Sequence, residues 1–174
     1  QMTLDEKIGQ LVQRMGGRSK SLNSQLGPEE LDKVRRGEVG SYLHVAGADA
    51  LRELQRVAVE ESRLGIPLLF SMDVVHGYRT IFPVPLAIAA SWDPEAAERH
   101  ARVAATEASA AGLHWTFAPM VDIARDPRWG RIVEGAGEDA YLGSRMAAAQ
   151  VAGFQGNDLS AADTIMAGTK HFGA

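Results

Sequence analysis

The segment Pro67-Leu68-Leu69-Phe70-Ser71-Met72 decides the fold, and a carboxylate, Asp73, follows it directly. A strand with one face in water alternates apolar and polar residues, whereas an almost unbroken apolar run is typical of a strand that a parallel sheet buries on both faces. Gly65 lies just before the run and ends the preceding helical pattern. We therefore predict a buried parallel strand over residues 67–72, with Asp73 at its carboxyl end.

Strand and helix patterns alternate on both sides of this segment. Further strands are predicted over residues 39–45, 115–118 and 163–168. Helices are predicted over residues 3–15, 28–36, 49–64, 93–111 and 138–154. This order is typical of an α/β protein with a parallel sheet.

The number of strands sets the expected architecture. A complete eight-fold barrel needs about 250 residues, and this chain has 174 residues with four predicted strands. We therefore expect residues 1–174 to form the N-terminal, incomplete portion of a TIM-type (β/α)8 barrel, about half of it, with no second domain. Half a barrel exposes two strand edges, which would pair with the remaining half or with a second copy of the chain.

Composition argues against several classes of protein. The net charge is −4 and the basic residues are scattered, so nucleic-acid binding has little electrostatic support. No apolar run approaches the ~20 residues that span a bilayer, and residues 1–7 lack the pattern of a leader peptide, which also fits a chain from which a leader has been removed. The chain has no cysteine, and its histidines lack the pair spacing of a zinc site, so zinc binding has little support.

The long loops after predicted strands hold the candidate site. Barrels and doubly wound sheets place their chemistry at the carboxyl ends of parallel strands. Asp73, Arg131 and the pair Lys170-His171 all follow such ends. A carboxylate can accept hydrogen bonds from two adjacent hydroxyls, while the basic side chains supply donors. We predict that these four residues converge on one monosaccharide-sized cavity.

Other interpretations of the same residues stay open. Asp73 is also suited to capping the turn that runs to Gly77. His76 and Arg79 are further candidates for substrate contact, or else structural hydrogen-bond partners. Neighbouring side chains alternate across a strand, so only special backbone geometry would let Lys170 and His171 face one pocket.

Several charged residues of the loop 119–137 fit structural roles better. Arg125 and Arg128 are expected to pair with nearby carboxylates and stiffen the loop, while Trp129 suits either stacking on a sugar or plugging the base of the loop. Glu138 and Asp139 stand where a helix begins, so we interpret them as capping residues and not as a catalytic pair.

Several motifs occur in a specific order. They are residues 2–11, Asp73-Val74-Val75-His76-Gly77, Ala118-Pro119-Met120-Val121-Asp122, Arg125-Asp126-Pro127-Arg128-Trp129-Gly130-Arg131, Gly137-Glu138-Asp139 and Lys170-His171-Phe172. Together they resemble the amino-terminal barrel domain of glycoside hydrolase family three, in the branch of bacterial periplasmic β-glucosidases and β-xylosidases. The sister branch that removes N-acetylglucosamine carries an acidic Gly-Gly loop in place of residues 75–77, so this branch is disfavoured.

The resemblance implies that this chain binds the sugar and that the catalytic residues lie elsewhere in the enzyme. It implies that Asp73, Arg131, Lys170 and His171 bind hydroxyls of the terminal non-reducing sugar. It also implies that the nucleophile and the acid/base lie outside this chain, so no catalytic residue is expected in it. The parent reaction would be retaining hydrolysis that releases β-D-glucose or xylose, in the periplasm or after secretion, and it would need no cofactor and no metal. The chain alone is expected to be inactive. The alternative is a non-catalytic carbohydrate-binding or structural half-barrel that self-assembles.

Overall fold

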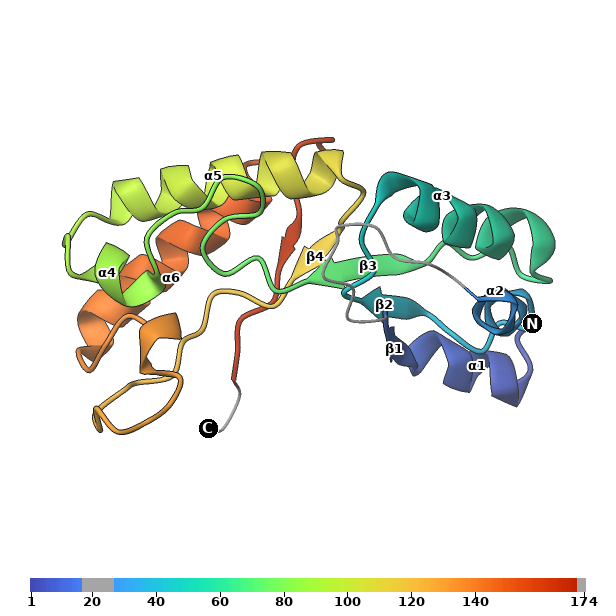
Figure 1. The fold of residues 1–174 in the computed structure, drawn as a ribbon, viewed down its shortest axis with the longest axis horizontal. Coiled ribbons are helices and arrows are strands. Elements are labelled where there is room, and N and C mark those ends of the chain that lie inside the picture. The colour runs from blue at the N-terminus through green and yellow to red at the C-terminus, as the bar shows by residue number, and fades with distance from the viewer. Residues whose placement is uncertain (17–26, 172–174) are drawn as a thin grey trace. The chain divides into compact units, whose positions relative to one another are not determined.

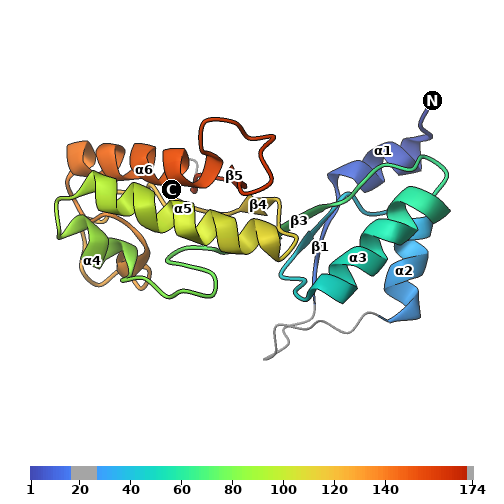
Figure 2. The same cartoon turned by 90° about the horizontal axis from the view of Figure 1, so that it is seen from above.

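The structure is a computed structural model that describes residues 1–16 and 27–171. It divides into two compact units, shown as ribbons in Figures 1 and 2. Unit 1 comprises residues 1–72 with 111–113, and unit 2 comprises residues 73–110 with 114–174. Phe172 of the last motif lies outside the described residues.

Unit 1 is a parallel sheet with helices between its strands. Its elements are α1 (Leu4–Leu11), β1 (Gln13–Met15), α2 (Pro28–Arg35), β2 (Ser41–Leu43), α3 (Ala48–Arg56), a π-helical segment η1 (Val57–Glu61) and β3 (Leu69–Met72). Strand β2 pairs in parallel with β1 and with β3, so that Ser41 is the partner of both Gln13 and Leu69. The strand predicted over residues 67–72 is therefore confirmed in its type and direction.

The predicted helix over residues 3–15 is wrong in its second part. The helix ends at Leu11, and residues 13–15 form the additional strand β1, which raises the number of described strands from the predicted four to five. The apolar stripe that suggested the longer helix is not its buried face, because Leu11 is 88% exposed. The helix instead buries Gly9, where a Cβ would stand only 1.9 Å from the Gly37 carbonyl oxygen. Close backbone approach, and not apolar periodicity, sets the orientation of α1.

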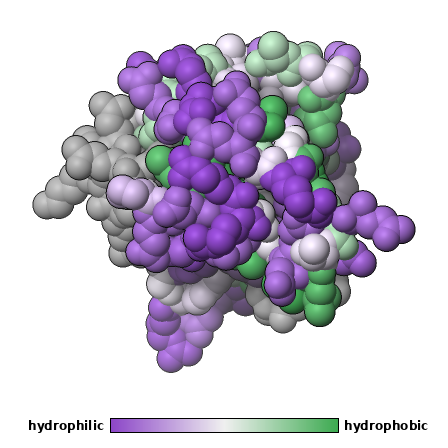
Figure 3. Space-filling view, turned by 90° about the vertical axis from the view of Figure 1, so that its right-hand side faces the viewer, coloured by the Kyte–Doolittle hydropathy of each residue, from purple (hydrophilic) through white to green (hydrophobic). Residues whose placement is uncertain are grey.

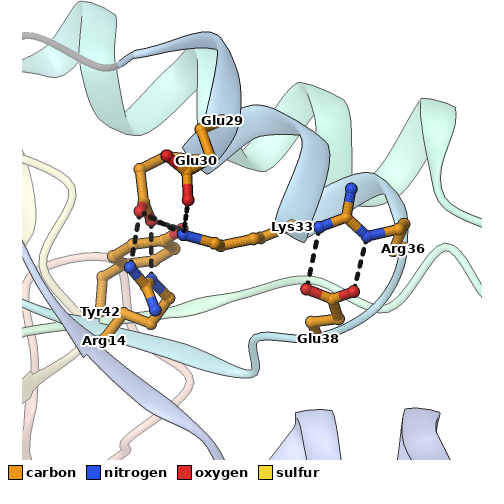
Figure 4. Close-up of polar contacts among 7 residues, drawn as sticks. All are labelled: Arg14, Glu29, Glu30, Lys33, Arg36, Glu38 and Tyr42. Atoms are coloured by element: carbon orange, nitrogen blue, oxygen red, sulfur yellow. Dashed lines mark hydrogen bonds and ion pairs between the residues drawn. The ribbon is translucent and has the colours of Figure 1, made fainter.

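A buried tyrosine anchors a polar network beside β2. Tyr42 is only 1% exposed, and its hydroxyl donates to Glu30 over 3.1 Å. Glu30 also accepts two hydrogen bonds from Arg14, at 2.8 and 2.7 Å, and one from Lys33 (Figure 4). A buried tyrosine needs such a partner for its hydroxyl. The network thereby ties α2 to β1 and β2.

Ion pairs cover the outer sides of the helices in unit 1. Arg35 pairs with Glu61, and Arg56 pairs with both Glu53 and Glu61. Figure 3 shows that hydrophilic residues gather over much of one face of the molecule. Exposed ion pairs of this kind contribute little stability each. The core of the unit instead comes from buried apolar side chains, among them Val45, Leu51, Leu54, Val57, Leu68 and Phe70.

Unit 2 combines two long helices with two short strands. Its elements are α4 (Pro85–Ala89), α5 (Pro94–Ala110), β4 (Trp115–Thr116), the 3-10 turn η2 (Ile132–Glu134), α6 (Ala140–Gln155) and β5 (Met166–Ala167). Helices α5 and α6 lie side by side in both Figure 1 and Figure 2. Helix α5 turns a face of alanines inward, and a Cβ on Gly153 of α6 would lie 2.3 Å from the Glu98 carbonyl oxygen. Small residues therefore allow the two helices to approach closely.

Strands β4 and β5 of unit 2 are also parallel, with Trp115 paired to Met166. The predicted alternation of parallel strands and helices is thus confirmed, although the strands are shorter than predicted. Helix α4 was not predicted, and it begins with Pro85, a residue that favours the first helical turn. Long segments follow β3 and β4, and these segments together with the residues directly after β5 carry the candidate site residues.

Candidate functional site

Three segments of unit 2 bring six polar side chains together. Asp73 follows β3, the loop after β4 supplies Asp122, Arg131 and Glu134, and Lys170 with His171 follows β5. Parallel pairing continues beyond the two strands of unit 2, because the Val121 N–H donates to the Lys170 carbonyl over 2.6 Å. We call these six residues the polar cluster.

Asp73 and Lys170 form one half of the polar cluster. The Lys170 Nζ donates to Asp73 Oδ1 over 2.9 Å, and the side chains are 15% and 37% exposed respectively. An ion pair with this exposure adds little to stability. Lysine carries three donors and a carboxylate several acceptor sites, so each of these groups can take part in more than one hydrogen bond.

His171 connects the other half. Its Nδ1 lies 2.9 Å from Asp122 Oδ2, and its backbone N–H donates to the same oxygen over 3.3 Å. Its Nε2 lies 3.2 Å from Nη1 of Arg131. The peptide bond between Lys170 and His171 is cis, and both side chains contact members of the cluster.

Glu134 holds Arg131 in place. The Arg131 Nε and Nη2 donate to the two oxygens of Glu134 over 2.7 and 2.6 Å. This bidentate bond raises the pKa of Arg131, and the nearby carboxylates of Asp122 and Asp73 add to the effect. The same bond lowers the pKa of Glu134, so the pair stays charged at neutral pH. Arg131 therefore presents a guanidinium of fixed orientation.

The structure separates two predicted residues from this cluster. His76 Nδ1 lies 2.9 Å from the carbonyl oxygen of Phe82, and the ring lines an apolar pocket formed with α4, α5 and α6. Arg79 is exposed, and its backbone N–H donates to Glu107. No described contact links either residue to the polar cluster, and their role in substrate contact stays a prediction.

The loop 119–137 also contains the expected structural residues. Arg128 pairs with Asp126 through both guanidinium and backbone bonds, as predicted. Asp139 is the N-cap of α6 and accepts from the Leu142 N–H, which confirms its interpretation as a capping residue. Trp129 is half-buried.

Sequence reasoning missed the partners of the cluster. The sequence pattern did not predict that Asp122 would contact His171 or that Glu134 would hold Arg131. The parallel order of strands 115–118 and 163–168 was the available signal, because it places residues just beyond one strand beside those just beyond the other.

Within residues 1–16 and 27–171, no group of three or more acidic or histidine side chains is arranged to hold a metal ion. In the same part of the chain, no helix is both long and apolar enough to cross a membrane.

Comparison with known proteins identifies the family. The model described as "Glycosyl hydrolase family 3 N terminal domain" matches residues 3–174. The chain belongs to glycosyl hydrolase family 3. The family 3 assignment predicted from the sequence motifs is thereby confirmed.

Relatives and solved structures agree with this assignment. The chain is 42% identical over 174 residues to a periplasmic β-glucosidase of Salmonella typhimurium, covering 99% of this chain and 22% of that protein. It is 34% identical to a putative β-xylosidase of Formosa agariphila, covering 98% of this chain and 25% of that protein. A β-glucosidase of Listeria innocua in complex with isofagomine superimposes with a TM-score of 0.86 at 41% identity, covering 99% of this chain and 24% of that one.

These matches bear on the architecture as well. The chain spans about a quarter of the length of the relatives it matches. The TM-score of 0.86 with a family 3 β-glucosidase confirms the predicted TIM-type α/β class, of which this chain is one part.

Proposed function

We propose that this chain carries the sugar-binding part of a β-glucosidase-type glycoside hydrolase, and that the nucleophile and the acid/base lie outside it. One observation carries the proposal: Lys170 donates to Asp73, its neighbour His171 contacts Arg131, and the Asp73 carboxylate lies near enough to Arg131 to help raise the pKa of this guanidinium. Family membership supports it, as do relatives named β-glucosidase and β-xylosidase. The preferred substrate would carry a terminal β-D-glucose or xylose.

The polar cluster suits a neutral, polyhydroxylated ring. Asp73 would accept hydrogen bonds from adjacent hydroxyls, while Lys170 and Arg131 would donate to hydroxyl oxygens. In a retaining reaction, a carboxylate from outside the chain attacks the anomeric carbon, and water later releases the sugar from the covalent intermediate. The contacts supplied by this chain would strengthen in the transition state and so raise the rate without touching the broken bond.

The proposal extends to the surroundings of the enzyme. One relative, from Salmonella typhimurium, is named as periplasmic. We extend this location, or secretion, to the present protein. The remaining part of the barrel would then complete the site, whereas a self-assembling half-barrel is the alternative that experiment has to exclude.

The test compares three proteins on an aryl β-glucoside. The full-length protein encoded by the gene should turn the substrate over, while the 174-residue chain alone should not. Asp73→Asn in the full-length protein should lower kcat/KM by about 10²-fold or more, because a charged acceptor of two hydroxyls is lost. Asp126→Asn is the matched control and should have little effect, since the described contacts of Asp126 are with Arg128 and its own loop. Turnover by the chain alone, or equal loss in both variants, would contradict the proposal.

A further inference from the structure

The imidazole of His171 lies between two side chains whose chemistry is fixed. On one side, Nη1 of Arg131 is 3.2 Å from Nε2, and a guanidinium can only donate hydrogen bonds. On the other side, Asp122 Oδ2 is 2.9 Å from Nδ1, and an ionised carboxylate can only accept. A single form of the ring satisfies both neighbours, namely the neutral imidazole with its proton on Nδ1.

We infer that Asp122 is a positioning residue that holds His171 as a hydrogen-bond acceptor, with Nε2 unprotonated and directed toward the polar cluster. The burial and the hydrogen bonds of Asp122 suit this role. Its side chain is only 6% exposed, and Oδ2 accepts from both the ring and the backbone N–H of His171. Its Oδ1 is buried and has no hydrogen-bond partner among the described residues. The contacts of this carboxylate are thus concentrated on one residue.

The backbone supports the same arrangement. The Val121 N–H donates to the Lys170 carbonyl, and the Lys170 N–H donates to the Pro119 carbonyl over 3.0 Å. These bonds fix the main chain just before Asp122 against the main chain just before His171. The paired backbone segments therefore help to hold the Asp122 carboxylate beside the His171 ring.

This inference rests on the proposed function and deepens it. Arg131 and Lys170 can only donate, so each would hold a hydroxyl through its oxygen, whereas Asp73 would accept from hydroxyls. A neutral His171 adds a second acceptor, because its Nε2 can accept a hydrogen bond from a sugar hydroxyl in place of the one from Arg131. A sugar hydroxyl would then be recognised through its O–H donor as well as through its oxygen. An ether or a fluorine at the same position has no such donor and should bind less well.

Nitrogen-15 NMR of the histidine rings tests the assignment directly. The full-length protein is labelled at histidine, and His171→Gln identifies the signal of His171. At neutral pH we expect Nδ1 to carry the proton and Nε2 to show the shift of an unprotonated nitrogen. A ring protonated on Nε2, or on both nitrogens, would overturn the inference. This measurement needs no turnover, so it decides the inference even if the protein hydrolyses no glucoside and the proposed function fails.

Variants of Asp122 separate positioning from general structural support. Asp122→Ala should weaken the preference of the ring for the Nδ1–H form and lower kcat/KM about 10- to 100-fold, as loss of a hydrogen bond to a charged group implies. Asp122→Asn keeps an oxygen that can accept from Nδ1, so it should restore part of the preference for the Nδ1–H form and part of kcat/KM. Asp126→Asn should change neither. If Asp122→Ala and Asp122→Asn leave the ring form and kcat/KM of the wild type intact, Asp122 does not position His171.

Discussion

Replacing Glu134 with glutamine tests whether Arg131 has to be held in place for sugar binding. The structure gives two charge-assisted hydrogen bonds from Arg131 to Glu134, at 2.7 and 2.6 Å. Bonds to charged groups contribute about 1.5–3 kcal/mol each when they are buried. Here the two side chains are 30% and 43% exposed. Screening by solvent and the acceptor that glutamine retains therefore reduce the expected loss to about 1–2 kcal/mol in total.

The assay is steady-state hydrolysis of an aryl β-glucoside by the full-length protein. A loss of about 1–2 kcal/mol corresponds to a fall of about 5- to 30-fold in kcat/KM. Asp126→Asn is the matched control, because it removes one carboxylate from the same loop and breaks a comparable pair with Arg128. If Glu134→Gln matches the wild type, or if both variants lose activity equally, Arg131 is not positioned by Glu134 in the way described.

Three further predictions concern stability, measured by urea unfolding. Arg63 lowers the pKa of Glu6 from 4.5 to about 2, so the stabilisation by this carboxylate is present above pH 4.5 and is lost as the pH falls toward 2. Glu6→Gln should therefore flatten the pH dependence of the free energy of unfolding in this interval, and an unchanged slope would contradict the prediction. Tyr42→Phe removes a buried hydroxyl that donates to a carboxylate and should lower the free energy of unfolding by about 1 kcal/mol, whereas an unchanged midpoint would show that the bond is not stabilising. Gly153→Ala places a Cβ 2.3 Å from a backbone oxygen and should destabilise the protein by about 1–3 kcal/mol. Gly143→Ala in the same helix brings its Cβ no closer than 3.8 Å to another atom and should be neutral or stabilising. Equal effects of the two variants would refute the close approach of α5 and α6.

Local sequence patterns predicted the strand–helix alternation because burial on both faces of a parallel sheet leaves a continuous apolar run, as in residues 67–72. They failed for residues 13–15, because the apolar periodicity of α1 continues into β1. What decides the boundary is backbone contact between Gly9 and Gly37 and pairing of β1 with β2. Such contacts join residues that are distant in sequence, and a periodicity within one segment does not contain them.

The candidate site, like the fold, was predicted from the sequence only in part. Position after a strand end made Asp73, Arg131, Lys170 and His171 candidates, and in the structure Lys170 contacts Asp73 while His171 contacts Arg131. It was not enough to separate them from His76 and Arg79, which follow the same strand as Asp73 but contact other parts of unit 2. The partners Asp122 and Glu134 depend on how two loops lie against each other, and only the fold specifies that.

A crystal structure of the full-length protein with bound glucose tests the central claim most directly. The account predicts one glucose ring whose hydroxyls lie within hydrogen-bonding distance of Asp73, Arg131, Lys170 and His171. It also predicts that Asp122 still contacts Nδ1 of His171 in that complex. Glucose bound at a site that involves none of these four side chains would contradict the account.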